Sequence, residues 1–457
     1  MNKVLVIGLD CAEPSLVFDR WKDRLPNFRK MFSHGVYGPL KSTIPPITVP
    51  AWSCMLSGKN PGQLGIYGFR NRRNYSYDQL FFANSSSVKE KRVWNILTEV
   101  GLKSIVIGVP QTYPPQVING IMVSSFLTPG KQSPFTHPPE IKRELEDYII
   151  DVENFRTDDK DRLLKDIYRM TENRFKVIKR YLKNREWDFF MFVEMGVDRI
   201  HHGFWRFSDP GHRLYQPGHK YEPAILDYYI YLDRQIGEIM ELLDPGTSVI
   251  TVSDHGAQSM VGGFCINDWL IEQGYLILKE KPAEPVPLSY DKIDWSKTKA
   301  WSEGGYYARV FMNVRGREPR GVIPGGEYET ERDKLAELLK ATRDEKGEPL
   351  GTVVYKPHEV YGPCKGIPPD LIVYLGNLSW RSQGKVGNSA LHIFENDTGP
   401  DDANHSQYGM FIGWEAGSDR SADRRDNLEI YDVSSTILSL LKVPIPGDMR
   451  GKAISIK

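Results

Sequence analysis

Short apolar runs alternate with helical stretches along this chain, and this alternation most limits what it can fold into. The apolar runs are rich in β-branched and aromatic residues and show no period of two, which predicts strands buried on both faces. We expect strands at 4–8, 104–109, 188–193, 248–252, 371–375 and 408–412, and helices near 93–99, 161–184, 223–243 and 431–441. Strands alternating with helices predict an α/β fold with a doubly wound, mainly parallel sheet sandwiched by helices.

Three segments break the alternation. The segment 280–326 contains many Pro and Gly residues, which predicts an inserted irregular or β-rich subdomain. The segments 67–84 and 203–222 are rich in aromatic and polar residues. Because long structured loops are usually functional, we predict that these two form loops over an active site.

Composition excludes several classes of protein. The 59 basic and 59 acidic side chains give a formal charge of zero, so no bulk nucleic-acid or membrane-surface partner is expected. The four cysteines form no CxxC pair, which argues against a disulfide framework and a cysteine-based zinc site. We expect no signal peptide, and no apolar run approaches the roughly 20 residues of a transmembrane helix. These features predict a soluble, cytoplasmic protein; they do not indicate its oligomeric state.

Acidic and histidine residues follow three of the predicted strands. Asp10 follows the first strand, and Asp254 and His255 follow the strand at 248–252. In a doubly wound sheet the ligand site lies beyond the carboxyl ends of the strands, so these side chains are expected to meet.

A second pair comes after the strand at 188–193. Asp198 and His202 are four residues apart in VDRIHHG, which places them on one face of a helix. His405 precedes the strand at 408–412. In total, three carboxylates and three imidazoles are available, enough for two divalent cations, and this donor set suits zinc or manganese better than calcium.

The segment TIPPITVPAWSCMLSG carries a candidate nucleophile. Pro50 fits the first turn of a helix that Gly58 ends, so Thr48 would lie at the helix amino terminus. Free N–H groups and the helix dipole favour a phosphate there. A threonine hydroxyl needs activation, which metal coordination supplies without a base.

Together these residues resemble the alkaline phosphatase superfamily, most closely its type I phosphodiesterase/nucleotide pyrophosphatase branch. The anchors are GLD, ITVPAW followed by SGKNPGQLGIYGF, VDRIHHG, SDHG and NHSQYGMFIGW. The resemblance covers nearly the whole chain and implies a single alkaline phosphatase-like catalytic domain over 1–457. It also implies two metal ions, with zinc ahead of manganese.

The resemblance further implies residue roles. The implied ligands are Asp198, His202 and His405 for one cation, and Asp10, Asp254 and His255 for the other, with Thr48 beside the second. Thr48 would attack phosphorus to form a phosphothreonine, which water then hydrolyses. His201 has no counterpart role in the family.

One position departs from the family pattern. The phosphodiesterase branch usually has an asparagine shortly after the nucleophile helix, and the aligned position here is Phe69. Arg70 and Asn71 are candidates to replace it in binding the substrate. No arginine lies immediately beside Thr48, which favours phosphodiesters over monoesters. The expected substrate is therefore a small phosphate ester, a nucleotide or another diester.

Other activities stay open. A phosphomonoesterase, phosphotransferase or phosphomutase of the same superfamily would use a similar metal set. A sulfatase is disfavoured, because Thr48 cannot be converted to formylglycine. A catalytically silent metal- or ligand-binding protein is the weaker alternative, since neither Thr48 nor any implied ligand is lost.

Overall fold

The structure is a computed structural model in which residues 2–456 are described. The chain divides into two compact units. The major unit comprises Met1–Leu64, Ala83–Ala257 and His405–Lys457, and the minor unit comprises Gly65–Phe82 and Gln258–Asn404. The segment 280–326, expected as an insertion, lies within the minor unit, together with most of 67–84.

The described part of the major unit contains a ten-stranded sheet. Its centre has the order β9-β1-β8-β5-β6, and these strands are all parallel. Their bounds are Ser248–Val252 (β9), Val4–Leu9 (β1), Phe189–Glu194 (β8), Ser104–Val109 (β5) and Gly120–Ser124 (β6). Four of the five coincide closely with apolar runs in the sequence, because a strand covered on both faces needs apolar side chains on both.

The flanks of this sheet are mixed. β21 (Tyr408–Glu415) runs antiparallel to β9 and to β2 (Gly35–Lys41), and β7 (Thr136–His137) runs antiparallel to β6. The short strands β22 (Asp423–Arg424) and β23 (Leu428–Glu429) pair with β2. The predicted α/β fold with a mainly parallel sheet is confirmed.

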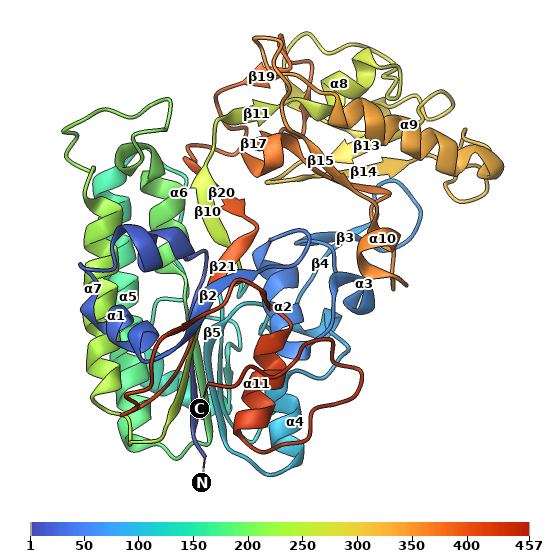
Figure 1. The fold of residues 1–457 in the computed structure, drawn as a ribbon. Coiled ribbons are helices and arrows are strands. Elements are labelled where there is room, and N and C mark those ends of the chain that lie inside the picture. The colour runs from blue at the N-terminus through green and yellow to red at the C-terminus, as the bar shows by residue number, and fades with distance from the viewer. Residues whose placement is uncertain (1, 457) are drawn as a thin grey trace. The chain divides into compact units, whose positions relative to one another are not determined.

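Helices cover both faces of the sheet (Figure 1). One face carries α1 (Pro26–Ser33), α5 (Lys160–Asn184), α6 (Gly196–Ser208) and α7 (Ala224–Met240). The other carries α2 (Thr48–Ser57), α4 (Val93–Glu99) and α11 (Asp432–Leu440), with the one-turn α3 (Pro61–Leu64) after α2. Shorter helical segments occupy Leu16–Arg20, Ser85–Ser87 and Pro139–Leu145.

The long helix α5 shows why these segments are helical. Asp159, directly before the helix, caps the first turn, because its side chain accepts a hydrogen bond from the Arg162 N–H at 3.2 Å. Leu163, Ile167 and Met170 then recur at spacings of four and three residues and are fully buried. One face of α5 therefore packs into the core while the opposite face stays polar.

Two expectations for the major unit differ from the structure. α6 continues to Ser208, so the first part of the predicted loop 203–222 is helical. The apolar run at 371–375 does form a strand, β16 (Leu371–Tyr374), but it belongs to the minor unit. A run buried on both faces does not reveal which of two sheets it joins.

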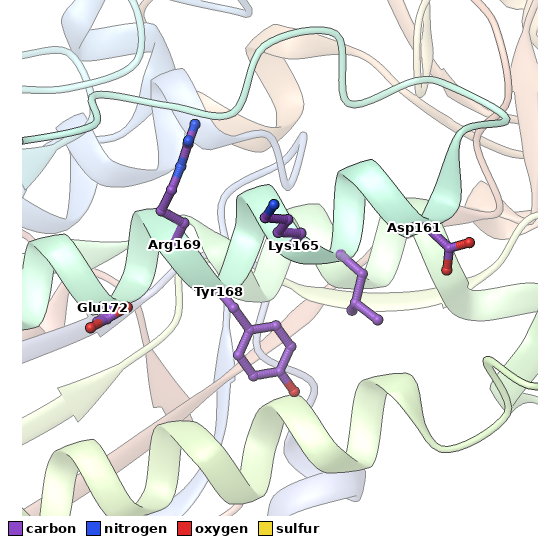
Figure 2. Close-up of a pocket in the computed structure, with 6 residues that line it drawn as sticks. Asp161, Lys165, Tyr168, Arg169 and Glu172 are labelled. Atoms are coloured by element: carbon purple, nitrogen blue, oxygen red, sulfur yellow. The ribbon is translucent and has the colours of Figure 1, made fainter.

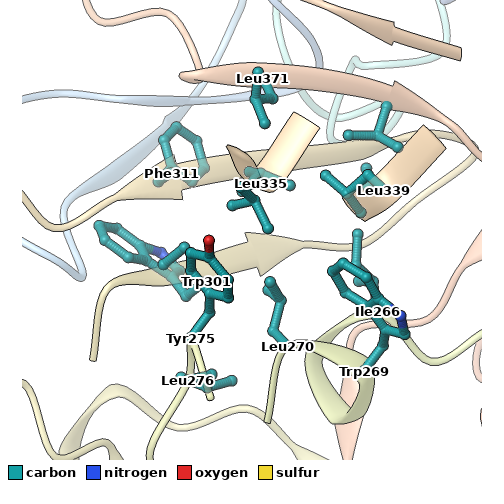
Figure 3. Close-up of a cluster of buried hydrophobic side chains, with 14 of the residues drawn as sticks. Ile266, Trp269, Leu270, Tyr275, Leu276, Trp301, Phe311, Leu335, Leu339 and Leu371 are labelled. Atoms are coloured by element: carbon teal, nitrogen blue, oxygen red, sulfur yellow. The ribbon is translucent and has the colours of Figure 1, made fainter. Parts of the chain in front are cut away.

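The minor unit is built on a four-stranded antiparallel sheet of order β13-β14-β16-β15. The other three strands are Ala300–Glu303 (β13), Ala308–Met312 (β14) and Val353–Tyr355 (β15). α8 (Ile266–Glu272) and α9 (Tyr328–Lys340) supply apolar side chains to its core, including Leu270, Leu335 and Leu339, which gather beside Trp301 and Phe311 (Figure 3).

Small sheets complete the minor unit. β11 (Gly262–Phe264) pairs with β17 (Trp380–Ser382) and β19 (His392–Ile393), β12 (Val286–Pro287) pairs with β18 (Lys385–Val386), and β3 (Arg70–Arg72) pairs with β4 (Leu80–Phe82). Helical segments lie at Tyr290–Lys292, Gly325–Glu327, Pro357–Tyr361 (α10) and Leu375–Leu378. β10 (Gly256–Ser259) and β20 (Ala403–Ser406) form a two-stranded sheet where the chain leaves and re-enters the major unit.

Among residues 2–456, no helix combines the length and the apolar character needed to cross a bilayer.

Candidate active site

The first strand of the sheet places Asp10. β1 ends at Leu9, between β8 and β9, so Asp10 emerges at the carboxyl edge of the sheet. Its Oδ2 accepts a hydrogen bond from Trp52 Nε1 at 2.7 Å. Gly8 makes room for this indole, because a Cβ on Gly8 would lie 2.8 Å from the Trp52 ring. The GLD motif thus combines a carboxylate with the space for the side chain that orients it.

Thr48 is the first residue of α2, as predicted, and Gly58 ends the helix with a left-handed φ of 66°. The N–H groups of Thr48 and Val49 have no partner within the helix, because the first turn of an α-helix leaves its N–H groups unpaired. Pro50 lacks an N–H and is tolerated in that turn. The Thr48 hydroxyl lies at the positive end of α2, with Oγ1 3.3 Å from His255 Nε2.

The residues after β9 lie beside Asp10. His255 Nε2 is 3.2 Å from Asp254 Oδ2 and 3.8 Å from Asp10 Oδ1. The other oxygen of Asp254 accepts a hydrogen bond from the Cys11 N–H at 3.3 Å. Asp10, Asp254 and His255 each present one ligand atom within 4.8 Å of the others.

α6 carries Asp198 and His202 on one face, as the four-residue spacing predicts. His202 Nε2 lies 3.2 Å from Asp198 Oδ1. The second oxygen of Asp198 accepts a hydrogen bond from Arg199, which also donates to both oxygens of Asp151 at 2.6 and 3.0 Å. Arg199 therefore fixes Asp198 Oδ2 and leaves Oδ1 facing His202.

His405 faces both groups of residues. It lies within β20, and its Nε2 is 3.9 Å from Asp198 Oδ1. Its ring stacks on that of His255, with centroids 3.7 Å apart and an interplanar angle of 15°. The six predicted ligands and Thr48 are thus brought together from five different segments of the major unit.

The imidazoles of His255 and His405 present Nε2 to this centre. His255 Nδ1 lies 3.1 Å from the Gly256 carbonyl oxygen, and His405 Nδ1 lies 2.9 Å from that of Pro46. A carbonyl oxygen can only accept, so each ring carries its proton on Nδ1 and a lone pair on Nε2. Burial lowers the pKa of His255 to about 4 and holds the pKa of His405 well below its usual value. Both rings are neutral near pH 7, which is the metal-binding form.

Three carboxyl groups share this buried space. Burial, and then the charge of Asp198, raises the pKa of Asp10 well above its usual value, and burial and Asp10 do the same to the pKa of Asp254. Burial also acts on Asp198, but His202 and Arg199 outweigh it and hold that pKa well below its usual value. The protein alone disfavours two of the three negative charges, and bound cations would remove that penalty.

The donor set fits divalent cations. Asp10 Oδ1 and Asp254 Oδ2 are buried, and neither accepts a hydrogen bond from the residues that the structure describes. A buried carboxylate oxygen without a donor is costly, and a cation would satisfy it. Carboxylate and imidazole donors together suit zinc or manganese.

His201, the neighbour of His202, faces away from the ligand cluster. Its Nδ1 lies 3.0 Å from the Cys11 carbonyl oxygen and its Nε2 lies 3.3 Å from the Tyr229 hydroxyl. Burial lowers the pKa of His201 to about 3, so the ring is neutral. Because both ring nitrogens are engaged, His201 supports the loop after β1 and is unsuited to bind a metal.

Sequence reasoning missed three side chains around the cluster. Trp52 orients Asp10, and Arg199 orients Asp198. The Sγ atom of Cys11 lies within 4.8 Å of ligand atoms of Asp198 and His202. Trp52 and Arg199 had a sequence signal, their places in the ITVPAW and VDRIHHG motifs, but the direction of all three side chains depends on tertiary packing.

The three predicted substrate-binding residues belong to the minor unit. Asn71 is buried, and its side chain accepts from the Tyr67 N–H and donates to the Gly68 carbonyl, so it closes its own turn. Arg70 is exposed, with Nη1 3.9 Å from Glu303 Oε2. Phe69 is partly buried. A role of Phe69, Arg70 or Asn71 in substrate binding stays a prediction.

A shallow surface hollow of about 540 Å³ lies along α5 (Figure 2). It is lined by Asp161, Leu164, Lys165, Tyr168, Arg169 and Glu172. Its charges are of both signs, and none of the predicted site residues lines it. The hollow is therefore no candidate for the active site.

Comparisons with known proteins show the family and the fold of the chain. A family model described as type I phosphodiesterase / nucleotide pyrophosphatase matches residues 4–401. No curated protein sequence matches the chain.

Two solved structures are similar over almost their whole length. Human ectonucleotide pyrophosphatase/phosphodiesterase 5 gives a TM-score of 0.56 at 13% identity, covering 99% of this chain and 97% of that one. The murine protein of the same name, an inactive threonine-to-alanine variant in complex with AMP, gives 0.54 at 13% identity, with 98% and 96% covered. At this identity the likeness shows the fold alone, whereas the family model covers most of the sequence. The chain belongs to the type I phosphodiesterase / nucleotide pyrophosphatase family.

Proposed function

We propose that this protein is a two-metal phosphodiesterase that cleaves small phosphodiesters with Thr48 as its nucleophile. Membership of a phosphodiesterase and nucleotide pyrophosphatase family supports the hydrolase class. The observation that carries the proposal is the position of the Thr48 hydroxyl, at the amino terminus of α2 and 3.3 Å from His255 Nε2. The Thr48 hydroxyl lies beside the buried carboxylates of Asp10 and Asp254, each of which has one oxygen that accepts no hydrogen bond from the described residues.

Two groups of residues would hold the metals. Asp10, Asp254 and His255 would bind one cation next to Thr48, and Asp198, His202 and His405 would bind the other. When bound, the cations would neutralise the buried carboxylates, acidify the threonine hydroxyl and withdraw charge from the phosphoryl oxygens. The mixed carboxylate and imidazole donors favour zinc, with manganese as the second choice.

The chain's own residues would bind and orient the substrate. The N–H groups at the start of α2 and the positive end of its dipole favour a phosphoryl group in front of Thr48. The Thr48 hydroxyl gives up its proton to water and its Oγ1 bonds to phosphorus as the bond to the leaving oxygen breaks. The leaving oxygen takes up a proton from water, and the second ester group stays on the phosphothreonine. Water attacks the phosphothreonine in a second step, which releases phosphate monoester and restores the hydroxyl.

Trp52 and Arg199 would hold the carboxylates in place during both steps. Each engages one oxygen of its carboxylate, Trp52 on Asp10 and Arg199 on Asp198, and so directs the other oxygen inward. Because Arg199 is committed to Asp198 and Asp151, it is not available to clamp a doubly charged monoester. This favours a singly charged diester, and the AMP complex of the murine neighbour makes nucleotide diesters the first substrates to try.

The test is the initial rate on bis-p-nitrophenyl phosphate, p-nitrophenyl phosphate and p-nitrophenyl sulfate, after chelation and re-addition of zinc or manganese. We expect metal-dependent cleavage that is fastest with the diester. Thr48→Ser should keep part of this activity and Thr48→Ala should lose it. Thr98→Ala, in α4, is the matched control and should cleave normally.

Faster cleavage of the monoester would point to a phosphomonoesterase instead. Diester cleavage by the chelated protein at the full rate would overturn the two-metal mechanism.

A further inference from the structure

A thiol belongs to the ligand cluster as well as carboxylates and imidazoles. Cys11 is fully buried, and its Sγ atom lies within 4.8 Å of a carboxyl oxygen of Asp198 and a ring nitrogen of His202. The three side chains come from two elements, the loop after β1 and the helix α6. Within residues 2–456, Cys11 is the one cysteine found in such a group.

Local structure holds the Cys11 side chain in this position. Its φ of 67° lies in the left-handed region, which residues other than glycine rarely adopt. The Cys11 N–H donates to Asp254 Oδ1, and Sγ lies 3.4 Å from the Gly256 carbonyl oxygen. The backbone and the side chain of Cys11 are thus both held by residues that follow β9.

The surroundings of Sγ contain the elements of a cation site. Asp198 Oδ2 is engaged by Arg199, so Oδ1 is the oxygen turned towards His202. Asp10 precedes Cys11 in the chain, and Asp254 accepts a hydrogen bond from the Cys11 N–H. Each of these two carboxylates has a buried oxygen that accepts no hydrogen bond within the described part of the chain. Several buried acceptor atoms around Cys11 therefore lack a donor, and a cation would satisfy them.

We propose that Cys11 Sγ is a ligand of the cation held by Asp198 and His202. The inference rests on the proposed function, because it adds a donor to one of the two metal sites. When the sulfur–metal bond forms, the thiol gives up its proton to solvent and the thiolate carries the charge. A thiolate is a soft donor, so this site would prefer zinc, cobalt or cadmium to manganese.

The sulfur also distinguishes the two metal sites of the protein. The site of Asp10, Asp254 and His255 has only oxygen and nitrogen donors, whereas the Cys11 site would add sulfur. Manganese is therefore expected to compete better at the first site than at the second. A preparation with mixed metals would place zinc beside Cys11.

Substitution with cobalt tests directly whether a sulfur atom binds the metal. The full-length protein is stripped with a chelator and loaded with Co²⁺, whose visible bands report binding by any donor. A thiolate ligand adds a separate charge-transfer band in the near ultraviolet. We expect that band in the wild-type protein and in Cys364→Ser, which removes a half-buried thiol of the minor unit.

Cys11→Gly should lose the near-ultraviolet band and keep the visible bands. Glycine is chosen because it adopts a φ of 67° without strain, so the loop after β1 keeps its path. In competition titrations, the preference for zinc over manganese should fall at least about tenfold. The loss of the sulfur should weaken zinc binding by that much, because even residues that only orient a ligand contribute about tenfold to metal affinity.

The outcomes separate the two proposals. Visible cobalt bands without a charge-transfer band, or a band that survives in Cys11→Gly, would overturn the role of Cys11 and leave the metal sites in place. A wild-type protein that binds no cobalt at all would overturn the proposed function together with this inference.

Discussion

Two groups of buried carboxylates, one in each compact unit, differ in how far hydrogen bonds from the protein complete them. In the minor unit, Arg317 donates to both Glu318 and Asp370. Arg72, Tyr328 and the backbone N–H groups of Val314 and Met312 supply the remaining bonds. Each of the four carboxylate oxygens accepts at least one hydrogen bond, so both carboxylates are fully paired within the unit.

In the major unit, the carboxylates at the ends of the strands are left incomplete. Asp10 Oδ1 and Asp254 Oδ2 are as deeply buried as Glu318, yet neither accepts a hydrogen bond from any described residue. A buried carboxylate oxygen without a donor is costly, and a bound cation would satisfy both of these oxygens. The Glu318 and Asp370 carboxylates are thus completed by the protein itself, whereas Asp10 and Asp254 each keep one oxygen that the proposed cations would complete.

The largest expected effect comes from removing an open carboxylate. Asp254→Asn should lower kcat/KM on a phosphodiester by about ten-thousandfold, or about 5 kcal/mol, because a metal ligand is lost. The metal-free variant should melt no lower than wild type, since a neutral amide relieves the repulsion from Asp10. Kinetics of the metal-loaded proteins check the first statement, and calorimetry of the chelated proteins checks the second.

Asp233→Asn is the matched control for that variant. Asp233 is a buried carboxylate of the major unit that accepts hydrogen bonds from the N–H groups of Asn27 and Phe28. We expect this substitution to lower the melting temperature and to spare catalysis. If Asp254→Asn destabilises the chelated protein as much as Asp233→Asn does, the contrast between open and paired carboxylates is wrong.

The next effect is on the stability of the minor unit. Glu318→Ala should cost about 3–5 kcal/mol of unfolding free energy, because it leaves the buried Arg72 and the half-buried Arg317 without that partner. Metal content should not change. Glu337→Ala, which removes an exposed ion pair with Lys340, is the control and should have little effect. Equal losses for Glu318→Ala and Glu337→Ala in calorimetry would show that the buried network does not stabilise the unit.

Metal removal should act on the major unit alone. A cation present at a hundred times its Kd stabilises the folded state by about 2.7 kcal/mol, and chelation should remove that amount. Hydrogen exchange should accelerate in the segments after β1 and β9 and stay constant in β13 and β14. Faster exchange in the strands of the minor unit would contradict this assignment of the metal sites.

The smallest effect is expected from a side chain that only orients a ligand. Trp52→Phe removes the hydrogen bond to Asp10 and should weaken metal binding about 10–100-fold. Trp94→Phe is the matched control. Trp94 lies in α4, away from the ligand cluster, and its substitution removes a comparable hydrogen bond, from Nε1 to Gln116 Oε1 at 3.0 Å. Calorimetric titration with zinc should separate the two variants, and equal affinities would remove Trp52 from the site.

Much of the central fold could be predicted from the sequence. β1, β5, β8 and β9 are apolar runs covered on both faces, and this pattern is strong in the sequence. β2 carried no such signal, because its sequence GVYGPLK contains two glycines and a proline. The extent of the minor unit was also hidden, since it is assembled from two segments separated by most of the major unit.

The ligand residues of the candidate site could be predicted from the sequence, but the side chains that orient them could not. Polar residues directly after buried strands must meet at one edge of a parallel sheet, so Asp10, Asp254 and His255 could be grouped from position alone. The orienting partners depend on which helix packs against which strand. Arg199 and Cys11 are neighbours of predicted ligands in the sequence, but the direction of their side chains is set by packing.

The most direct test of the central claim is to look for phosphate on Thr48 during turnover. The zinc-loaded protein is mixed with a phosphodiester, quenched in acid, digested and examined by mass spectrometry. We predict that the peptide containing Thr48 carries the phosphoryl group with the substrate's second ester group still attached. We also predict no turnover by Thr48→Ala at unchanged metal content. Diester cleavage by Thr48→Ala at the wild-type rate, with both metals bound, would contradict the account.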